Sequence, residues 1–166
     1  SAGEFGWPWG GNGDHYQTAS DFYNTRFSVK KMGGVYNSFR DYYTQGGWGN
    51  GINWTIGSNE GSTLNSLLSL VKSKGVASIQ LATWNNYNEG TTIEPTLETG
   101  TSLLETLQTF TGVPYTQLDL DRCTRWYEVT REAESTHHKN ICRQIYFELS
   151  SLNTQRADEL FEILED

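Results

Sequence analysis

The amino-acid sequence predicts an α/β fold with parallel strands, followed by a helical extension. Up to about residue 114, short apolar runs alternate with amphipathic stripes at helical spacing, which is typical of βαβ units. No glycine follows Gly112, and beyond that point the apolar residues recur only at helical spacing. We therefore expect an α/β part over residues 1–114 and a helical part over residues 115–166.

Three apolar runs are predicted strands, at residues 5–9, 31–39 and 76–84. Pro8 has no N–H group, so we do not expect it at a central position of a strand ladder. In the third run, alternate residues fall on opposite faces of the strand. A long loop rich in glycine and asparagine follows the second run, and we expect Trp48 and Trp54 to pack beneath it.

Helices are expected after each of these strands. Asp14 is the predicted N-cap of a helix over residues 15–27, whose apolar residues recur three and four positions apart. The second helix is expected to begin at residue 62 or 63 and to be ended by Gly75. The third is expected over residues 103–110.

The part after residue 115 carries apolar stripes typical of packed helices. Cys123 and Cys142 lie 19 positions apart in this part, and they are either two helix-packing thiols or one disulfide between helices. His137 and His138 lie in a polar stretch and are expected in an exposed loop. No Cys or His spacing is typical of zinc, so we expect no metal site and no cofactor.

The charge balance argues against two classes of partner. The chain has 12 Lys and Arg against 20 Asp and Glu, with a net charge of −8 and no basic cluster that could neutralise phosphates. We therefore expect neither nucleic-acid binding nor binding to an anionic membrane. No apolar run reaches the roughly 18–20 residues that span a bilayer, and no signal peptide is present.

The segment after the third predicted strand combines aromatic, amide and acidic side chains. Aromatic rings can stack on the C–H face of a sugar, amides bind hydroxyl groups, and a carboxyl group can transfer a proton. The alternative is a connecting loop with polar groups in solvent. The residues concerned are Trp84, Asn85, Asn86, Tyr87, Glu89 and Glu94.

The whole stretch from Trp84 to Pro95 resembles the signature loop of glycoside hydrolase families 71 and 99. Family 71 typically reads Trp-Asn-Asp-Tyr-Gly-Glu-Ser there, and family 99 reads Trp-Asn-Glu-Trp-His-Glu-Gly-Thr-x-Ile-Glu-Pro. Trp7-Pro8-Trp9 is similar to a Trp-Pro segment at the end of an earlier barrel strand. Residues 31–39 resemble a Lys-x-Met-x-x-Val-x-Pro-x-Phe segment of the next strand. The resemblance covers about residues 5–105.

The resemblance implies a fold and an activity. Both families are (β/α)8 enzymes that act on α-linked glucan or mannan, so the chain is expected to be the C-terminal portion of a TIM-type barrel followed by an α-helical appendix. The missing strands would come from another chain segment or be covered by self-association, because an eight-stranded barrel takes about 200–400 residues. A processed or subcloned chain from a larger, secreted or periplasmic glycoside hydrolase is expected.

By position, Glu89 matches the second acidic residue of the family motif and is the expected general acid/base. Asn86 stands where the families have their first acidic residue, and an amide cannot ionise to act as a base. The partner is an oligosaccharide or polysaccharide. A non-catalytic carbohydrate-binding relative and an inactive fragment of a larger glycosidase remain alternatives. The expected substrate-binding residues are Trp84, Asn85, Asn86, Tyr87, Glu94, Trp7, Trp9 and Tyr36.

Overall fold

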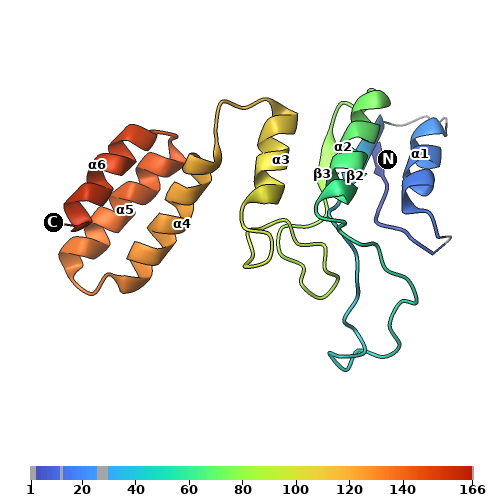
Figure 1. Cartoon of the computed structure of the whole chain (residues 1–166), viewed down its shortest axis with the longest axis horizontal. Coiled ribbons are helices and arrows are strands. Elements are labelled where there is room, and N and C mark those ends of the chain that lie inside the picture. The colour runs from blue at the N-terminus through green and yellow to red at the C-terminus, as the bar shows by residue number, and fades with distance from the viewer. Residues whose placement is uncertain (1–2, 12, 26–29, 166) are drawn as a thin grey trace. The chain divides into compact units, whose positions relative to one another are not determined.

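The computed structural model describes residues 3–11, 13–25 and 30–165. Over these residues the protein is mixed α/β, with six helices and a three-stranded parallel sheet, which confirms the predicted class. The chain forms two compact units, Ser1–Thr111 and Gly112–Asp166. Unit 1 holds the sheet with helices α1 to α3, and unit 2 holds helices α4 to α6 (Figure 1).

The sheet consists of β1 (Gly3–Phe5), β2 (Lys30–Val35) and β3 (Ile79–Leu81), in that spatial order. Both pairings are parallel. Parallel pairing places the carboxyl ends of all three strands at one edge of the sheet. The long segments that follow β2 and β3 emerge together on one side of unit 1, below the helices in Figure 1. The sheet therefore gathers three connecting segments at one edge.

All three strands are shorter than predicted, and β1 overlaps the predicted run 5–9 at Phe5 alone. Residues 6–9 lie beyond β1, since Pro8 cannot donate to a ladder and the aromatic side chains on either side of it are half exposed. Residues 36–39 lie beyond β2, and Phe39 pairs instead with Ile56 in an antiparallel bridge. Residues 76–78 and 82–84 lie outside β3.

The predicted helices of unit 1 are present. Helix α1 (His15–Asn24) has Asp14 as its N-cap, whose carboxylate accepts a hydrogen bond from the Gln17 N–H at 2.8 Å. The helix ends at Asn24, earlier than predicted, because Thr25 is already extended; residue 27, the predicted end, lies outside the described residues. Helix α2 (Ser62–Ser73) begins after Gly61. Helix α3 (Ser102–Thr111) is followed by Gly112 at a positive φ of 69°.

The core of unit 1 lies between the sheet and α2. One face of α2 buries Leu64, Leu67 and Val71 almost completely against the end of β2. A methyl group on Gly33 would lie 2.7 Å from Val71 Cγ1, so the helix approaches the strand where no side chain intervenes. In the long loop, Trp54 packs on Phe39 with ring centroids 4.5 Å apart, as predicted. The prediction was wrong for Trp48, whose side chain is 80% exposed.

Unit 2 is built of α4 (Gln117–Glu132), α5 (Thr136–Ser150) and α6 (Thr154–Glu165). Its core is formed by Ile141, Ile145, Ala157, Leu160 and Phe161 from α5 and α6. Both cysteines are free thiols; Cys142 is buried, whereas Cys123 is exposed. His137 and His138 were expected in a loop and instead lie in the first turn of α5.

That helix start has a specific local cause. Ser135 is the N-cap of α5, and its hydroxyl accepts a hydrogen bond from the His138 N–H at 3.0 Å. A serine cap satisfies an N–H group that the first turn leaves without a helical partner. The polar stretch is therefore a helix start, although both histidines stay exposed.

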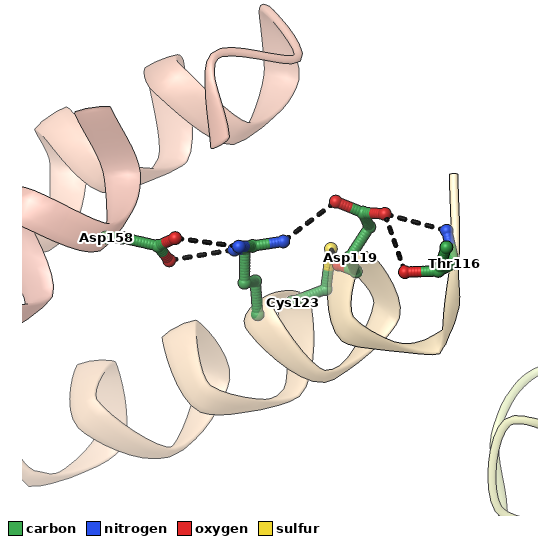
Figure 2. A network of polar contacts seen from close by, with 5 residues as sticks. Thr116, Asp119, Cys123 and Asp158 are labelled. Carbon is green, nitrogen blue, oxygen red and sulfur yellow. Dashed lines mark hydrogen bonds and ion pairs between the residues drawn. The ribbon is translucent and has the colours of Figure 1, made fainter. Parts of the chain in front are cut away.

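An ion-pair network joins α4 to α6 (Figure 2). The Arg122 guanidinium donates to both carboxylate oxygens of Asp158, at 2.8 and 2.7 Å, and also to Asp119 at 2.8 Å. Asp119 in turn accepts from the Thr116 N–H at 2.7 Å and closes the capping box of α4. The Arg122 guanidinium lowers the pKa of Asp158. A residue of the α4 cap, Asp119, thus positions the arginine that binds α6.

Replacing Gly34 by alanine should destabilise unit 1. A methyl group there would lie 1.8 Å from the Gly6 carbonyl oxygen, a backbone atom that cannot rotate away. We expect Gly34→Ala to lower the free energy of unfolding by about 2–3 kcal/mol, the upper range for overpacking. Gly6→Ala is the matched control, because its methyl group would meet Phe22 at an ordinary 3.6 Å. Equal losses in the two variants, measured by urea unfolding with tryptophan fluorescence as the signal, would contradict the close approach.

Asp158→Asn should destabilise unit 2 in a pH-dependent way. The pKa of Asp158 is lowered in the folded state, so its contribution is present above the unfolded value of about 3.9 and is lost as the pH falls below it. Because the side chain is 41% exposed, we expect a loss of about 0.5–1 kcal/mol at neutral pH. The loss should shrink toward zero at about pH 2.

The measurement is urea unfolding followed by the indole N–H signal of Trp126, the one tryptophan in the sequence of unit 2. Glu159→Gln is the control, because its ion pair with Arg156 lies within α6 and joins no two helices. A loss in Asp158→Asn that is the same at neutral and acid pH would argue against the ion pair as its cause.

Candidate functional site

The segment after β3 closes on itself as a compact loop. The Thr83 N–H donates to the Thr91 carbonyl at 2.6 Å, and the Ile93 N–H donates to the Trp84 carbonyl at 2.9 Å. Thr91 and Ile93 are almost fully buried, at 0% and 1% exposure, and so anchor the returning segment of the loop. The residues between the two anchoring ends are consequently presented together at the edge of the sheet.

Glu89 accepts one hydrogen bond on each carboxylate oxygen. The Tyr43 hydroxyl donates to Oε1, and the Asn86 side-chain amide donates to Oε2 at 3.0 Å. An ionised carboxylate can accept both bonds. These donors come from two different loops. The Glu89 side chain is therefore fixed in one orientation.

Backbone pairing holds these two loops together. The Arg40 N–H donates to the Glu89 carbonyl at 2.8 Å, and the Tyr42 N–H donates to the Asn88 carbonyl at 2.8 Å. Gly90 has a positive φ of 58°, and a methyl group on it would lie 3.3 Å from the Arg40 carbonyl oxygen. A side chain at position 90 would thus be strained by the backbone and crowded by the neighbouring loop. The segment after β2 sets the place of Tyr43 relative to Glu89.

A second carboxylate in the loop is held in the same manner. The Tyr87 hydroxyl donates a hydrogen bond to Glu94 Oε1. Trp84 and Tyr87 are 55% and 57% exposed, so their rings are open to solvent on at least one face. Asn85 is exposed, and its side chain has no hydrogen-bond partner among the described residues. The loop therefore combines two tyrosine-held carboxylates with accessible aromatic rings.

The other predicted site residues lie elsewhere in unit 1. Trp7, Trp9 and Tyr36 line a cavity of about 120 Å³ against α1. They follow the carboxyl ends of β1 and β2, as expected, and they lie together. The expected residues thus form two groups: the loop group around Glu89, and the cavity group beside α1.

Tyr43 was not selected from the sequence, although it follows the second predicted strand. Its signal was positional, because residues just beyond neighbouring parallel strands converge at one edge. His15 was also missed; it is the first residue of α1 and lies beside Tyr36. Nothing in its local sequence distinguishes it from an ordinary helix residue.

Within the described ranges, no group of three or more His, Cys, Asp and Glu could hold a metal ion. Among the same residues, no helix is both long and apolar enough to cross a membrane. No protein-family model matches the chain, and neither a curated protein nor a solved structure matches it. Function is consequently inferred from the geometry of the site and from the resemblance of its loop.

The hydrogen bonds of the two tyrosines can be tested by their titration. The hydrogen bond to Glu89 raises the pKa of the Tyr43 hydroxyl, with smaller contributions in the same direction from burial and from the charges of Glu89 and Asp41. Glu94 raises the pKa of Tyr87 in the same way. We expect Glu89→Gln to lower the pKa of Tyr43 toward the ordinary value of about 10, because the negative charge is lost.

Each variant is the control for the other. Glu94→Gln should lower the pKa of Tyr87 and leave that of Tyr43 in place, as followed by ¹³C NMR of labelled tyrosine. A pKa of Tyr43 that is indifferent to Glu89→Gln would refute the arrangement around Glu89.

Proposed function

We propose that the protein is a glycoside hydrolase acting on α-linked glucan, mannan or a related glycan, with its site at the loop after β3. The observation that carries the proposal is Glu89, whose carboxylate is oriented by Tyr43 and Asn86 at the carboxyl edge of a parallel sheet. Ligand sites of parallel α/β folds gather at this edge. The resemblance of residues 84–95 to the loop of families 71 and 99 adds the substrate class.

The proposed chemistry uses two carboxyl groups. One gives its proton to the glycosidic oxygen as the bond to the anomeric carbon breaks, and the other attacks that carbon or takes a proton from the attacking water. We assign the acid/base role to Glu89 and the second role to Glu94, which Tyr87 holds in the same loop. The exposed rings of Trp84 and Tyr87 would carry the sugar by stacking, and Asn85 would bind hydroxyl groups.

The proposed fold is a part of a (β/α)8 barrel. Its support is the parallel order of three strands with helices between them, together with the edge positions of β1 and β3 in the sheet of the described residues. An open edge exposes unpaired backbone groups, which further strands would satisfy. Further strands from another chain segment, or a second copy of the chain, would complete the site. The substrate class favours a secreted or periplasmic location for the proposed enzyme.

A second candidate is a carbohydrate-binding protein without hydrolysis. Asn86 favours it, because this position is acidic in the two families and the amide here donates its hydrogen bond to Glu89. An amide in that position can orient Glu89, but it cannot supply the second ionisable group. The two candidates share the ligand and differ in whether Glu94 serves as the second carboxylate.

Hydrolysis is tested by reducing-sugar release from α-1,3-glucan and from α-mannan. We expect Glu89→Gln and Glu94→Gln each to lower kcat by about 10²–10⁴-fold, the contribution usual for a positioned acid or base. Glu98→Gln is the matched control, because Glu98 is an exposed carboxylate of the same loop. Its backbone N–H donates to the Thr96 hydroxyl, and the substitution leaves that hydrogen bond in place. Its rate should stay within about twofold of the wild type.

The outcomes separate the candidates. Glycan binding by the wild type without turnover would contradict hydrolysis and favour the binding protein. If turnover is seen and Glu89→Gln retains it, the role of Glu89 is wrong. A loss in Glu98→Gln without a loss in Glu94→Gln would move the second role from Glu94.

A further inference from the structure

A cavity of about 120 Å³ lies between α1 and the ends of β1 and β2. Its volume is below the roughly 300 Å³ of pockets for drug-sized ligands. Aromatic side chains dominate its lining. They are Trp7, Trp9, Phe22, Tyr23 and Tyr36. The cavity thus has the scale of one ring and flat apolar walls.

Glycine backbone lines one side of the cavity. Gly6 and Gly34 both contribute to the lining, and the Gly34 position leaves no room for a methyl group beside the Gly6 carbonyl oxygen. The Tyr23 hydroxyl accepts a hydrogen bond from the Gly34 N–H at 3.0 Å. This bond satisfies a backbone group of β2 beyond its pairing with β1, which ends at Phe5 and Met32. The wall is therefore built without an unsatisfied backbone donor at Gly34.

The solvent side is formed by the two tryptophans. Trp7 and Trp9 are 47% and 53% exposed, whereas Tyr23 and Tyr36 are buried. Trp9 is steadied by Trp54 of the long loop, with ring centroids 5.7 Å apart at an angle of 64°. An exposed tryptophan held in place by a second ring offers a fixed flat face to a ligand.

One polar pair stands in this aromatic lining. His15 Nδ1 lies 3.0 Å from the Tyr36 hydroxyl, and its other ring nitrogen has no hydrogen-bond partner among the described residues. Burial lowers the pKa of His15, against an opposing effect of the Asp14 carboxylate, and so favours the neutral ring. Burial also raises the pKa of Tyr36, which therefore keeps its proton. One hydrogen bond therefore joins His15 to Tyr36, and its direction depends on the tautomer of the histidine.

This pair can present either a donor or an acceptor. If the Tyr36 hydroxyl donates to Nδ1, the histidine carries its proton on Nε2; if Nδ1 donates, Nε2 is an acceptor. A hydroxyl group of a ligand both donates and accepts, so the pair can match it in either tautomer. Among the described residues, no Lys, Arg, Asp or Glu lines the cavity, which argues against an ionic ligand.

We propose that this cavity is a subsite for a single neutral sugar ring, with His15 as the residue that binds one of its hydroxyl groups. The inference rests on the proposed function, because it gives the carbohydrate a second place of contact at the same edge of the sheet. Trp7 and Trp9 stack on the C–H face of the ring, while His15 and Tyr36 select for a hydroxyl. His15 is a specificity-determining residue here and takes no part in bond cleavage.

The test is ¹⁵N NMR of the histidine rings of the whole chain, titrated with an α-1,3-linked glucotetraose and with an α-linked mannotetraose. The chain has three histidines, and His137 and His138 in unit 2 are internal references. His15→Gln assigns the His15 signals. We expect one of the two sugars to shift the His15 ring signals saturably, while the signals of His137 and His138 stay in place.

A pair of tyrosine variants tests the hydroxyl contact. Tyr36→Phe removes the partner of His15 and should weaken sugar binding by about two- to tenfold, the range of one hydrogen bond. Tyr16→Phe is its matched control, because Tyr16 lies one residue from His15 on α1, is exposed and does not line the cavity. It should bind as the wild type does. Equal affinities of the two variants would overturn the role of the His15 and Tyr36 pair.

Failure of this inference is distinguishable from failure of the proposed function. If the sugars shift the backbone amides of residues 86–90 and leave His15 unchanged, the loop binds carbohydrate and the cavity does not. If neither set of signals moves, the proposed function fails together with the subsite. A His15 shift caused by tetramethylammonium, and by neither sugar, would identify an aromatic cage for a cation and overturn the proposal.

Discussion

Parallel pairing of β2 with both β1 and β3 is the constraint from which the rest of unit 1 follows. Because all three strands run in one direction, the segments that leave them begin at one edge of the sheet. Two close approaches lie next to this pairing: Gly34 lies against the Gly6 carbonyl, just beyond the paired residues of β1 and β2, and Gly33 lies beneath Val71 of α2. Larger residues at these two positions would separate the strand from its neighbours. The edge that gathers the polar residues is thus set by residues that have no side chain.

Two loops at this edge together fix Glu89. The loop after β3 is closed by its own hydrogen bonds and is anchored by the buried Thr91 and Ile93. The segment after β2 runs beside it and brings Tyr43 to the carboxylate. Binding groups held by backbone pairing and buried anchors lose little freedom when a ligand arrives. The arrangement around Glu89 is thus ordered before any ligand binds, as a candidate site requires.

The sequence was sufficient where local patterns determine the outcome. Asp14 marked the start of α1, and the apolar spacing marked α2 and α3, because caps and helical periodicity are local properties. The strands were predicted to extend too far at their carboxyl ends. The point where residues 6–9 leave the sheet depends on the partner strand and not on the local sequence. The hydrogen bond from Tyr43 to Glu89 joins residues 46 positions apart in the chain. The hydrogen bond between His15 and Tyr36 joins residues 21 positions apart. No local pattern encodes such pairs. Ser135 shows that a helix N-cap can also be overlooked when it lies in a polar stretch.

The central claim is that the carboxyl edge of this sheet binds an α-linked glycan beside Glu89. Its most direct test is a crystal structure of the chain with an α-1,3-linked glucan or α-linked mannan oligosaccharide bound. We predict a sugar ring stacked on Trp84 or Tyr87, with a glycosidic oxygen within hydrogen-bond reach of Glu89, about 2.6–3.2 Å. A bound oligosaccharide that contacts none of residues 84–94 would contradict it.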